Sequence, residues 1–244
     1  MIASTNLELG IFQCCKGRLS QLSKTLPHNL EAAKDRSVLF TLVDYSCPDG
    51  TTDWVLRERK EDILAGRLAV LRVETDAPWR MATVKNISGR LAARLGAKWL
   101  LSLDADNYVT PKELEVFSEL SARGFAYHGL ATMTDGSCGR IGLPTSLYLS
   151  CNGFREDSPP AGAHDKDLVV RIRASGTKVF RRTPDIAAID NSVWAKIRYT
   201  TLNTPLNYRN ECLRYVYPDT APPPMPQVTG KLYFKTAFGT EVTV

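Results

Sequence analysis

The segment WLLSLDADN, Trp99 to Asn107, runs from five mostly apolar residues directly into two carboxylates, Asp104 and Asp106. An apolar run of this length, closely followed by Pro111, predicts a buried strand that ends in a loop. Because side chains two apart on extended backbone point the same way, Asp104 and Asp106 are expected to face one crevice. In open α/β sheets, ligands bind beyond the carboxyl ends of the strands, where paired carboxylates suit a divalent cation that carries phosphates. A bare Asp-x-Asp is more commonly a solvated strand end, so the pair needs support from other segments.

Strand and helix patterns alternate ahead of this segment. Apolar runs predict strands at 7–15, 38–43 and 68–73, and apolar residues at helical spacing predict helices from Leu19 to Leu30, at 54–64 and at 84–95. Pro27 is expected to break or restart the first helix near its middle. Asp44 follows the second strand and adds a third carboxylate at a strand's carboxyl end. This order predicts an α/β fold with a mostly parallel central sheet and right-handed crossovers.

The sequence after Pro111 predicts further elements in less regular order. They are a helix at 111–122, a strand at 125–132, a Gly/Ser-rich turn at 134–140, a strand at 141–150 broken by Pro144, a helix opened by Asp165, a strand at 178–182, a helix within 208–215 and a last strand at 230–237. We expect one domain at 1–217 and a Pro-rich C-terminal arm at 218–244.

The composition is that of an ordinary globular protein. The chain has 244 residues, 43% hydrophobic and 23% charged, with 31 Lys and Arg against 26 Asp and Glu, a balance of +5. This mild excess suits anionic ligands and does not require nucleic acid. Without a signal sequence or an apolar segment long enough to cross a bilayer, we expect a cytoplasmic protein, with peripheral membrane association left open. The six cysteines show no C-x-x-C spacing and are expected to be buried thiols.

Five blocks of the sequence, taken together, resemble a known family. They are CCKGRLSQLSKTLPHNL, LVDYSCPDGTTDW, KN ahead of an Ala-rich helix, LLSLDADN, and NGFRED followed by GAHDKDLVVRI. They are similar, in the same order, to blocks of glycosyltransferase family 2, whose members use nucleotide sugars and have the GT-A fold. The similarity covers roughly the first four-fifths of the chain, and ordered blocks are more specific than any single motif.

The resemblance implies roles for the residues that match on the donor side. Asp44 looks like the acid that reads the nucleotide base or ribose, and a carboxylate can accept hydrogen bonds from both. Lys85 would face the uracil or phosphate region, with Asn86 as its hydrogen-bonding neighbour. Asp104 would point to the ribose and Asp106 would bind the metal ion.

The resemblance also implies a catalytic base and a pocket wall. Asp165 matches the Asp of the family's Glu-Asp motif, which is the base, whereas His164 stands where the family has Glu. Gly153 lies where the family shapes its acceptor and donor-sugar pocket. For a second metal ligand we consider Asp190 first and Asn191 second, since both offer oxygen to a hard cation, with His164 as the rival.

The function implied by the resemblance is inverting transfer of a sugar, expected from a UDP-sugar, to a glycan hydroxyl in polysaccharide biosynthesis, with Mn²⁺ or Mg²⁺ as cofactor. A metal ion would act as Lewis acid on the leaving diphosphate and Asp165 as general base. Trp79 is the best candidate to stack on a sugar ring. A sugar nucleotidyltransferase is one alternative, although CCKGRLS is a poor version of its phosphate loop. A non-catalytic nucleotide-sugar-binding protein is another, because of His164.

Overall fold

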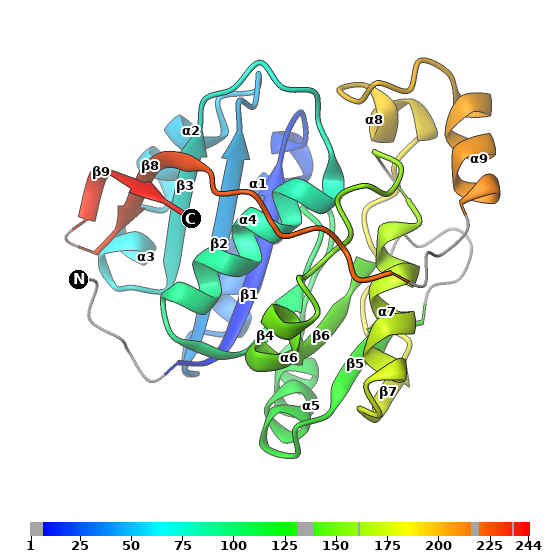
Figure 1. Ribbon diagram of the computed structural model, residues 1–244. Coiled ribbons are helices and arrows are strands. Elements are labelled where there is room, and N and C mark those ends of the chain that lie inside the picture. The colour runs from blue at the N-terminus through cyan, green and yellow to red at the C-terminus, as the bar shows by residue number, and fades with distance from the viewer. Residues whose placement is uncertain (1–6, 131–138, 161, 216–219, 236) are drawn as a thin grey trace.

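The computed structural model describes residues 7–130, 139–160, 162–215, 220–235 and 237–244. Within them a single sheet has the strand order β7-β5-β6-β4-β1-β2-β3-β8-β9, and helices lie on both of its faces (Figure 1). The strands are β1 (Leu7–Cys15), β2 (Val38–Tyr45), β3 (Leu68–Val73), β4 (Ala97–Ser102), β5 (Ala126–Gly129), β6 (Ile141–Pro144), β7 (Val179–Arg182), β8 (Thr229–Phe234) and β9 (Ala237–Thr243).

The expected mostly parallel sheet is confirmed. Strands β4, β1, β2 and β3 are parallel neighbours at its centre. Strand β6 is antiparallel to both β4 and β5, and β7 is parallel to β5, so β5 and β7 run in the central direction. Only β6 and β8 among these strands run against it, since β9 is antiparallel to β8.

The helices connect the strands, and up to residue 122 they do so in the order that the alternating sequence pattern predicts. They are α1 (Leu19–Ala32), α2 (Thr51–Glu58), α3 (Lys60–Leu64), α4 (Met81–Arg94), α5 (Pro111–Ala122), α6 (Thr145–Ser150), α7 (His164–Ala174), α8 (Val193–Ile197) and α9 (Pro205–Arg214). Helix α5 has the strongest start signal: Thr110 and Glu113 form a reciprocal capping box and Pro111 occupies the first turn. No helix in the described ranges combines the length and apolarity that crossing a bilayer would require.

Alternating side chains on the central strands fill two apolar layers. In β2, Phe40 and Leu42 pack into a cluster with α1 and α5, whereas Leu39 and Val43 pack into a cluster with α4. A sheet buried on both faces reads as a nearly continuous apolar run, which is what 38–43 shows. The rigid sheet therefore fixes where the carboxyl ends of its strands present side chains.

Helix α1 continues through Pro27, so the expected break there is wrong. An interior proline costs roughly 3 kcal/mol because it lacks an amide donor and crowds the preceding turn. Leu22, Leu26 and Leu30 are all buried, and burying a leucine contributes about 1.5–3 kcal/mol. Tertiary packing of this face outweighs the local cost.

Two other element predictions need correction. The expected strand at 141–150 is the short strand β6 followed by helix α6, with Pro144 as the residue before the helix. The expected helix at 54–64 starts earlier, at Thr51, and is divided into α2 and α3 at Arg59. Residues 131–138, which hold the end of the strand expected at 125–132 and most of the turn expected at 134–140, lie outside the described residues.

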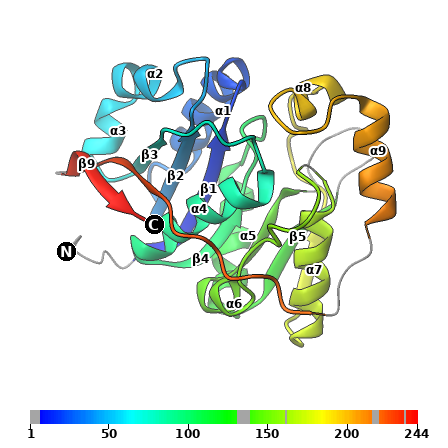
Figure 2. The same cartoon turned by 45° about the horizontal axis from the view of Figure 1, so that its top comes forward.

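The C-terminal strands extend the central sheet. Strand β8 pairs antiparallel with β3, and β9, which the sequence pattern does not predict, forms a hairpin with β8. Ahead of them, the segment 220–228 starts beside the loop at Asn152, whose amide donates to the carbonyl of Pro222. Figures 1 and 2 both show this segment running across the α4 side of the sheet to β8.

The two ends of the sheet carry different helices. Helices α2 and α3 lie near β3, whereas α8 and α9 lie on the opposite side of the molecule, above α7 in the view of Figure 2. The carboxyl ends of β1, β2 and β4 lie between these two groups of helices, and the loop with Asp104 and Asp106 follows β4 there.

Candidate active site

The loop that carries Asp104 and Asp106 is held by side chains of β1 and α1. Thr25 donates to the carbonyl of Ala105 at 2.7 Å, and Asn29 donates to the carbonyl of Asn107 at 3.0 Å. Both side chains are fully buried on α1. The turn after β4 therefore depends on polar residues on the inner side of α1, and the carboxylates have a fixed backbone beneath them.

Lys85 joins two acidic segments that are far apart in the sequence. Its Nζ lies 3.2 Å from Oδ1 of Asp104 and 3.0 Å from Oδ1 of Asp165, and its side chain is only 3% exposed. Lys85 is on α4, Asp104 follows β4, and Asp165 is in the first turn of α7. Asp104 and Asp165 therefore meet at one buried cation, which makes their proximity tolerable.

The protonation states follow from this arrangement. Burial disfavours the charged form of Lys85, yet Asp104 and Asp165 raise its pKa above the ordinary value. Burial likewise opposes the charge on Asp165, but Lys85, through its charge and its hydrogen bond, holds the pKa of Asp165 below its ordinary value. Asp165 is consequently a carboxylate at neutral pH, the form that a general base requires.

His164 places a nitrogen lone pair in the same site. Its Nδ1 lies 2.6 Å from the carbonyl oxygen of Gly162, which can only accept, so Nδ1 carries the hydrogen. Burial is the main cause that lowers the pKa of His164, so the ring is neutral at neutral pH. Its buried Nε2 makes no hydrogen bond within the described residues, although Oδ1 of Asp165 is 3.3 Å away. Nε2 of His164 can therefore accept a hydrogen bond from a hydroxyl group of a ligand.

Asp106 is short of positive charge. Burial, followed by the charge of Asp104, raises the pKa of Asp106 to about 6, and Arg18 only partly offsets this from 3.8 Å. Oδ1 of Asp106 accepts a hydrogen bond from Asn107 at 2.5 Å, and Oδ2 accepts one from the amide of Asn191. A carboxylate with a raised pKa would be stabilised by a cation that arrives with a ligand.

The two residues considered as a second metal ligand occupy different places. Asn191 contacts Asp106 through its amide nitrogen, and its Oδ1 accepts from Gln21 at 3.0 Å. As oriented, Asn191 is a hydrogen-bond donor to Asp106. Asp190 is exposed, and its Oδ1 accepts the backbone amide of Asn191 at 2.8 Å.

Few described side chains that could ligate Mn²⁺ or Mg²⁺ lie together in the site. In the part of the chain that the structure describes, no three His, Cys, Asp or Glu side chains form a group that could hold a metal ion. Mg²⁺ usually binds through one or two carboxylates and completes its shell with water and substrate phosphates. Asp106 fits that mode, in which much of the shell arrives with the substrate.

Asp44 is buried and lies within β2, because this strand continues to Tyr45 and does not end at residue 43 as predicted. Its Oδ1 accepts the amide of Cys47 at 2.8 Å, and its Oδ2 accepts the amide and hydroxyl of Thr52 at 2.9 and 2.6 Å. Both oxygens therefore hold the turn between β2 and α2. Contact of Asp44 with a nucleotide stays a prediction.

Asn86 fixes the loop that follows α6. Its amide nitrogen donates to the carbonyl of Phe154 and to Glu156, and its oxygen accepts from the amide of Phe154 and the hydroxyl of Tyr148, all at 2.8 Å. Gly153 has φ of +57°, and a Cβ there would lie 2.3 Å from Oδ1 of Asn86. Both residues are thus structural in this ligand-free arrangement, and their contact with a nucleotide sugar stays a prediction.

A buried ion-pair network fixes the start of α7. Asp167 and Arg171 have the i,i+4 spacing of a helical ion pair, and they form one at 2.6 Å. No local spacing in the sequence indicates the other members of the network. Arg155, whose side chain is also buried, adds a second contact to Asp167 at 3.3 Å. Arg171 also donates to the carbonyls of Cys151 and Gly153. The network ties the loop of Gly153 to the helix that presents Asp165.

The prediction that Trp79 stacks on a sugar ring is not supported, because Trp79 is only 6% exposed. Its ring packs edge-on against Tyr45, with centroids 6.0 Å apart, and its amide donates to the carbonyl of Tyr199. The segment around Tyr199 covers the loop, and no local pattern predicts that contact. The exposed tryptophan is instead Trp194, at 60%.

This chain is similar to known proteins in structure, but no match is found by sequence. No protein-family model matches this chain, and no curated protein matches it. A fragment of S. aureus TarS in complex with UDP has a TM-score of 0.59 at 14% identity, covering 84% of this chain and 63% of that one. The mannosyltransferase PcManGT from Pyrobaculum calidifontis, in complex with GDP-Man and Mn²⁺, has a TM-score of 0.58 at 15% identity, covering 76% and 57%.

A third similar structure is a mutant of Drosophila β1,4-galactosyltransferase 7 in complex with manganese, UDP-Gal and xylobiose. Its TM-score is 0.52 at 13% identity, and the match covers 88% of this chain and 82% of that one. This chain spans less than two thirds of the TarS fragment and of the mannosyltransferase. The likeness establishes a shared fold.

Proposed function

From the GT-A fold that this chain has, we propose that it transfers a sugar from a nucleotide-diphosphate donor to a hydroxyl of a glycan acceptor. The proposed donor is a UDP-sugar, the proposed reaction inverts the anomeric centre, and the proposed setting is polysaccharide biosynthesis. The observation that supports this best is the convergence of Asp104 and Asp165 on buried Lys85. The charge of Asp106, two positions after Asp104, is only partly offset by Arg18 at 3.8 Å.

We assign the diphosphate group of the donor to the part of the site around Asp106. Asp106 would hold Mn²⁺ or Mg²⁺, which when bound supplies Lewis-acid stabilisation to the leaving diphosphate. Asp190 is proposed as the second oxygen ligand, since it precedes Asn191, which contacts Asp106. Asp104 is proposed to contact the ribose, while Asp44, Lys85, Asn86 and Gly153 shape the rest of the donor site.

The base is assigned to Asp165. Its charge at neutral pH lets it accept the proton of an acceptor hydroxyl as the oxygen attacks. Lys85 would stabilise the carboxylate before attack, and Nε2 of His164 offers a second acceptor for a hydroxyl hydrogen. Attack opposite the leaving diphosphate gives inversion of the anomeric centre.

The neighbouring acid Glu156 is a weaker choice for the base. Its two oxygens accept hydrogen bonds from Asn86 at 2.8 Å and from Thr83 at 2.7 Å. These bonds fix the loop after α6 and leave the carboxylate less free to take a proton. Asp165 therefore stays the proposed base.

A nucleotide-release assay tests the proposal. The protein is incubated with Mn²⁺, an acceptor such as xylobiose and each of several UDP-sugars, and free UDP is measured with and without acceptor. Acceptor-dependent UDP release is the expected result. Pyrophosphate release from UTP and a sugar 1-phosphate would indicate a nucleotidyltransferase instead. UDP binding without turnover for any acceptor would leave a non-catalytic binding protein.

A further inference from the structure

We propose that the segment 194–215 forms an oligosaccharide-binding groove for the acceptor, with Trp194 as the aromatic surface on which a sugar ring stacks. This inference rests on the proposed function, because it names the acceptor subsite of the same centre. The groove consists of two adjoining cavities, one beside α8 and one beside α9.

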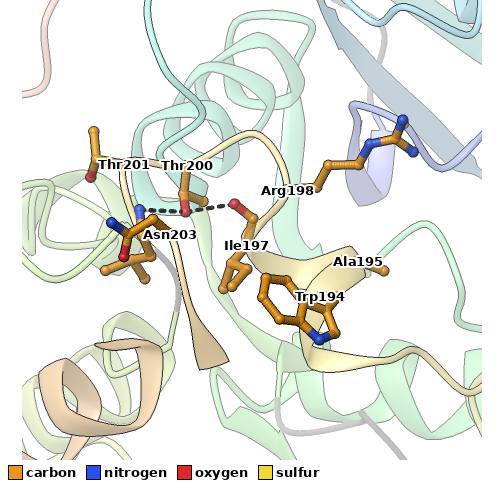
Figure 3. A pocket seen from close by; sticks show the side chains of 9 residues that line it. Trp194, Ala195, Ile197, Arg198, Thr200, Thr201 and Asn203 are labelled. Atoms are coloured by element: carbon orange, nitrogen blue, oxygen red, sulfur yellow. Dashed lines mark hydrogen bonds between the residues drawn. The ribbon is translucent and has the colours of Figure 1, made fainter. Parts of the chain in front are cut away.

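The first cavity has the chemistry of a sugar site. It has a volume of about 620 Å³ and lies between Gly17, after β1, and the residues of α8 and the turn that follows it. Small-molecule sites typically measure about 300–1,000 Å³. Figure 3 shows Trp194 on one side of the cavity and Thr201 and Asn203 on the other. An exposed aromatic face opposite a hydroxyl and an amide suits a pyranose, which has apolar faces and an equatorial rim of hydroxyl groups.

The wall that bears Thr201 is fixed by an internal turn. The hydroxyl of Thr200 donates to the carbonyl of Ile197 at 2.9 Å and accepts the amide of Leu202 at 3.0 Å (Figure 3). Thr200 is therefore occupied with its own backbone. Thr201 and Asn203 are exposed, but Oδ1 of Asn203 accepts a hydrogen bond from the side-chain amide of Asn207. Within the described residues the indole nitrogen of Trp194 makes no hydrogen bond. The hydroxyl of Thr201, the amide nitrogen of Asn203 and the indole nitrogen are therefore available to a ligand.

The charge of the first cavity favours a neutral ligand. Arg198 is the one formally charged residue among the described residues that line it. A nucleoside diphosphate would require more positive charge or a metal ion, and the proposed metal position is at Asp106. A neutral saccharide has no such requirement.

The second cavity lengthens the site beyond one sugar ring. It has a volume of about 650 Å³, and Thr201 and Leu202 line both cavities. Its other walls include Arg80, the loop 157–160 and Glu211 on α9. A ligand that fills both cavities would be an oligosaccharide.

The groove is connected at both ends to the proposed reaction centre. Trp194 follows Asn191 by three positions, and Asn191 contacts Asp106. At the other end α9 packs against the loop before Asp165, since a Cβ on Gly162 would lie 2.5 Å from Sγ of Cys212. An oligosaccharide in the groove would therefore have its two ends near the segments that contact Asp106 and precede Asp165.

Intrinsic tryptophan fluorescence gives a direct test without the donor. Trp79 and Trp99 are buried and Trp54 packs against the core, so a ligand-induced change reports mainly on Trp194. The full chain is titrated with xylobiose, cellobiose and N,N′-diacetylchitobiose to roughly 20 mM, which would nearly saturate a site with a Kd of 1 mM. At least one saccharide is expected to change the emission with a saturable curve.

Matched variants separate stacking from folding. Trp194→Ala is expected to raise the KM for acceptor about 3- to 10-fold, the worth of an aromatic contact, and Trp194→Phe to recover most of the loss. UDP binding should be unchanged in both. Phe180→Ala, which removes an aromatic ring that is 42% exposed on β7, is the control and should leave the acceptor KM unchanged.

Three outcomes overturn the assignment. They are a fluorescence change caused by UMP and by none of the saccharides, no response to any of the three saccharides, and an acceptor KM that is unaffected by Trp194→Ala. Failure of the proposed function is distinct, because it appears as absent UDP binding or absent UDP release and does not involve saccharide titration. Saccharide binding that calorimetry detects in the wild type and not in Trp194→Ala would support the groove even then, since calorimetry does not depend on the fluorescence of Trp194.

Discussion

Replacing Lys85 with methionine tests whether one buried cation holds the site together. Methionine keeps much of the side-chain volume and removes the charge that lies 3.2 Å from Asp104 and 3.0 Å from Asp165. At an effective dielectric constant of about 20, each contact has a Coulomb energy of roughly 5 kcal/mol, much of which is offset by the desolvation of Lys85. Removing one partner of a buried pair typically costs about 3–5 kcal/mol.

For Lys85→Met we expect a loss of stability at the lower end of the range for a buried pair. The carboxylates remain 27% and 18% exposed, so water screens part of the charge left behind. We expect Lys85→Met to lower the free energy of unfolding by about 3 kcal/mol at pH 7, or the melting temperature by about 6–12 °C for a chain of this size. Lys112→Met, at an exposed position on α5, is the control and should change the melting temperature very little.

The pH dependence of this loss identifies its cause. In the wild type the lowered pKa of Asp165 contributes stability above the ordinary value of about 4, and this stability is lost as pH falls through the lowered pKa. Without Lys85, burial is less opposed and the pKa of Asp165 should rise, so the folded variant binds a proton before the unfolded chain does. The difference between wild type and variant should therefore be greatest at pH 7–8 and shrink toward pH 5. Urea or thermal unfolding across this range measures it, and an equal loss at both pH values would refute the electrostatic explanation.

Three further predictions concern the base, the loop of Gly153 and the residues near the metal position. Asp165→Asn should keep UDP binding and lower acceptor-dependent UDP release at least about 100-fold; retained transfer would place the base elsewhere. Gly153→Ala should cost about 3 kcal/mol in urea unfolding, from a left-handed backbone and a 2.3 Å contact, whereas Gly124→Ala, with φ of +63° and open space, should cost about 1 kcal/mol; similar losses would contradict the crowding argument. Asp190→Ala should weaken Mn²⁺-dependent UDP binding more than Asn191→Ala in calorimetry, because Asp190 is the proposed oxygen ligand whereas Asn191 donates a hydrogen bond to Asp106; the reverse order would remove Asp190 from the metal site.

The central sheet was largely predictable because its signals are local. The run 99–103 and the runs at 7–15 and 68–73 are apolar, short and bounded by polar turns, and β1 and β3 match the expected ranges to the residue. Helix α5 was equally clear, since Thr110, Pro111 and Glu113 form its start within four positions. Strand β9 gave no such signal, because its residues are mostly exposed and its pairing with β8 is the main reason for its conformation.

The candidate site was predictable in part. Ordered sequence blocks indicated that Asp104, Asp106 and Asp165 belong together, and the structure brings Asp104 and Asp165 to one lysine. The location of Lys85 between them depends on how α4 packs against the sheet, which no local pattern encodes. The burial of Trp79 likewise depends on the distant residue Tyr199. Long-range contacts of this kind decide which polar and aromatic residues remain available to ligands.

Calorimetric titration of UDP, with and without Mn²⁺, tests the central claim most directly, namely that the carboxylates after β4 receive a diphosphate together with a metal ion. We expect UDP to bind the wild-type chain in the presence of Mn²⁺, to bind much more weakly with chelator present, and to lose the metal-dependent part in Asp106→Ala. UDP binding that is equally strong without metal, or unchanged in Asp106→Ala, would contradict the account.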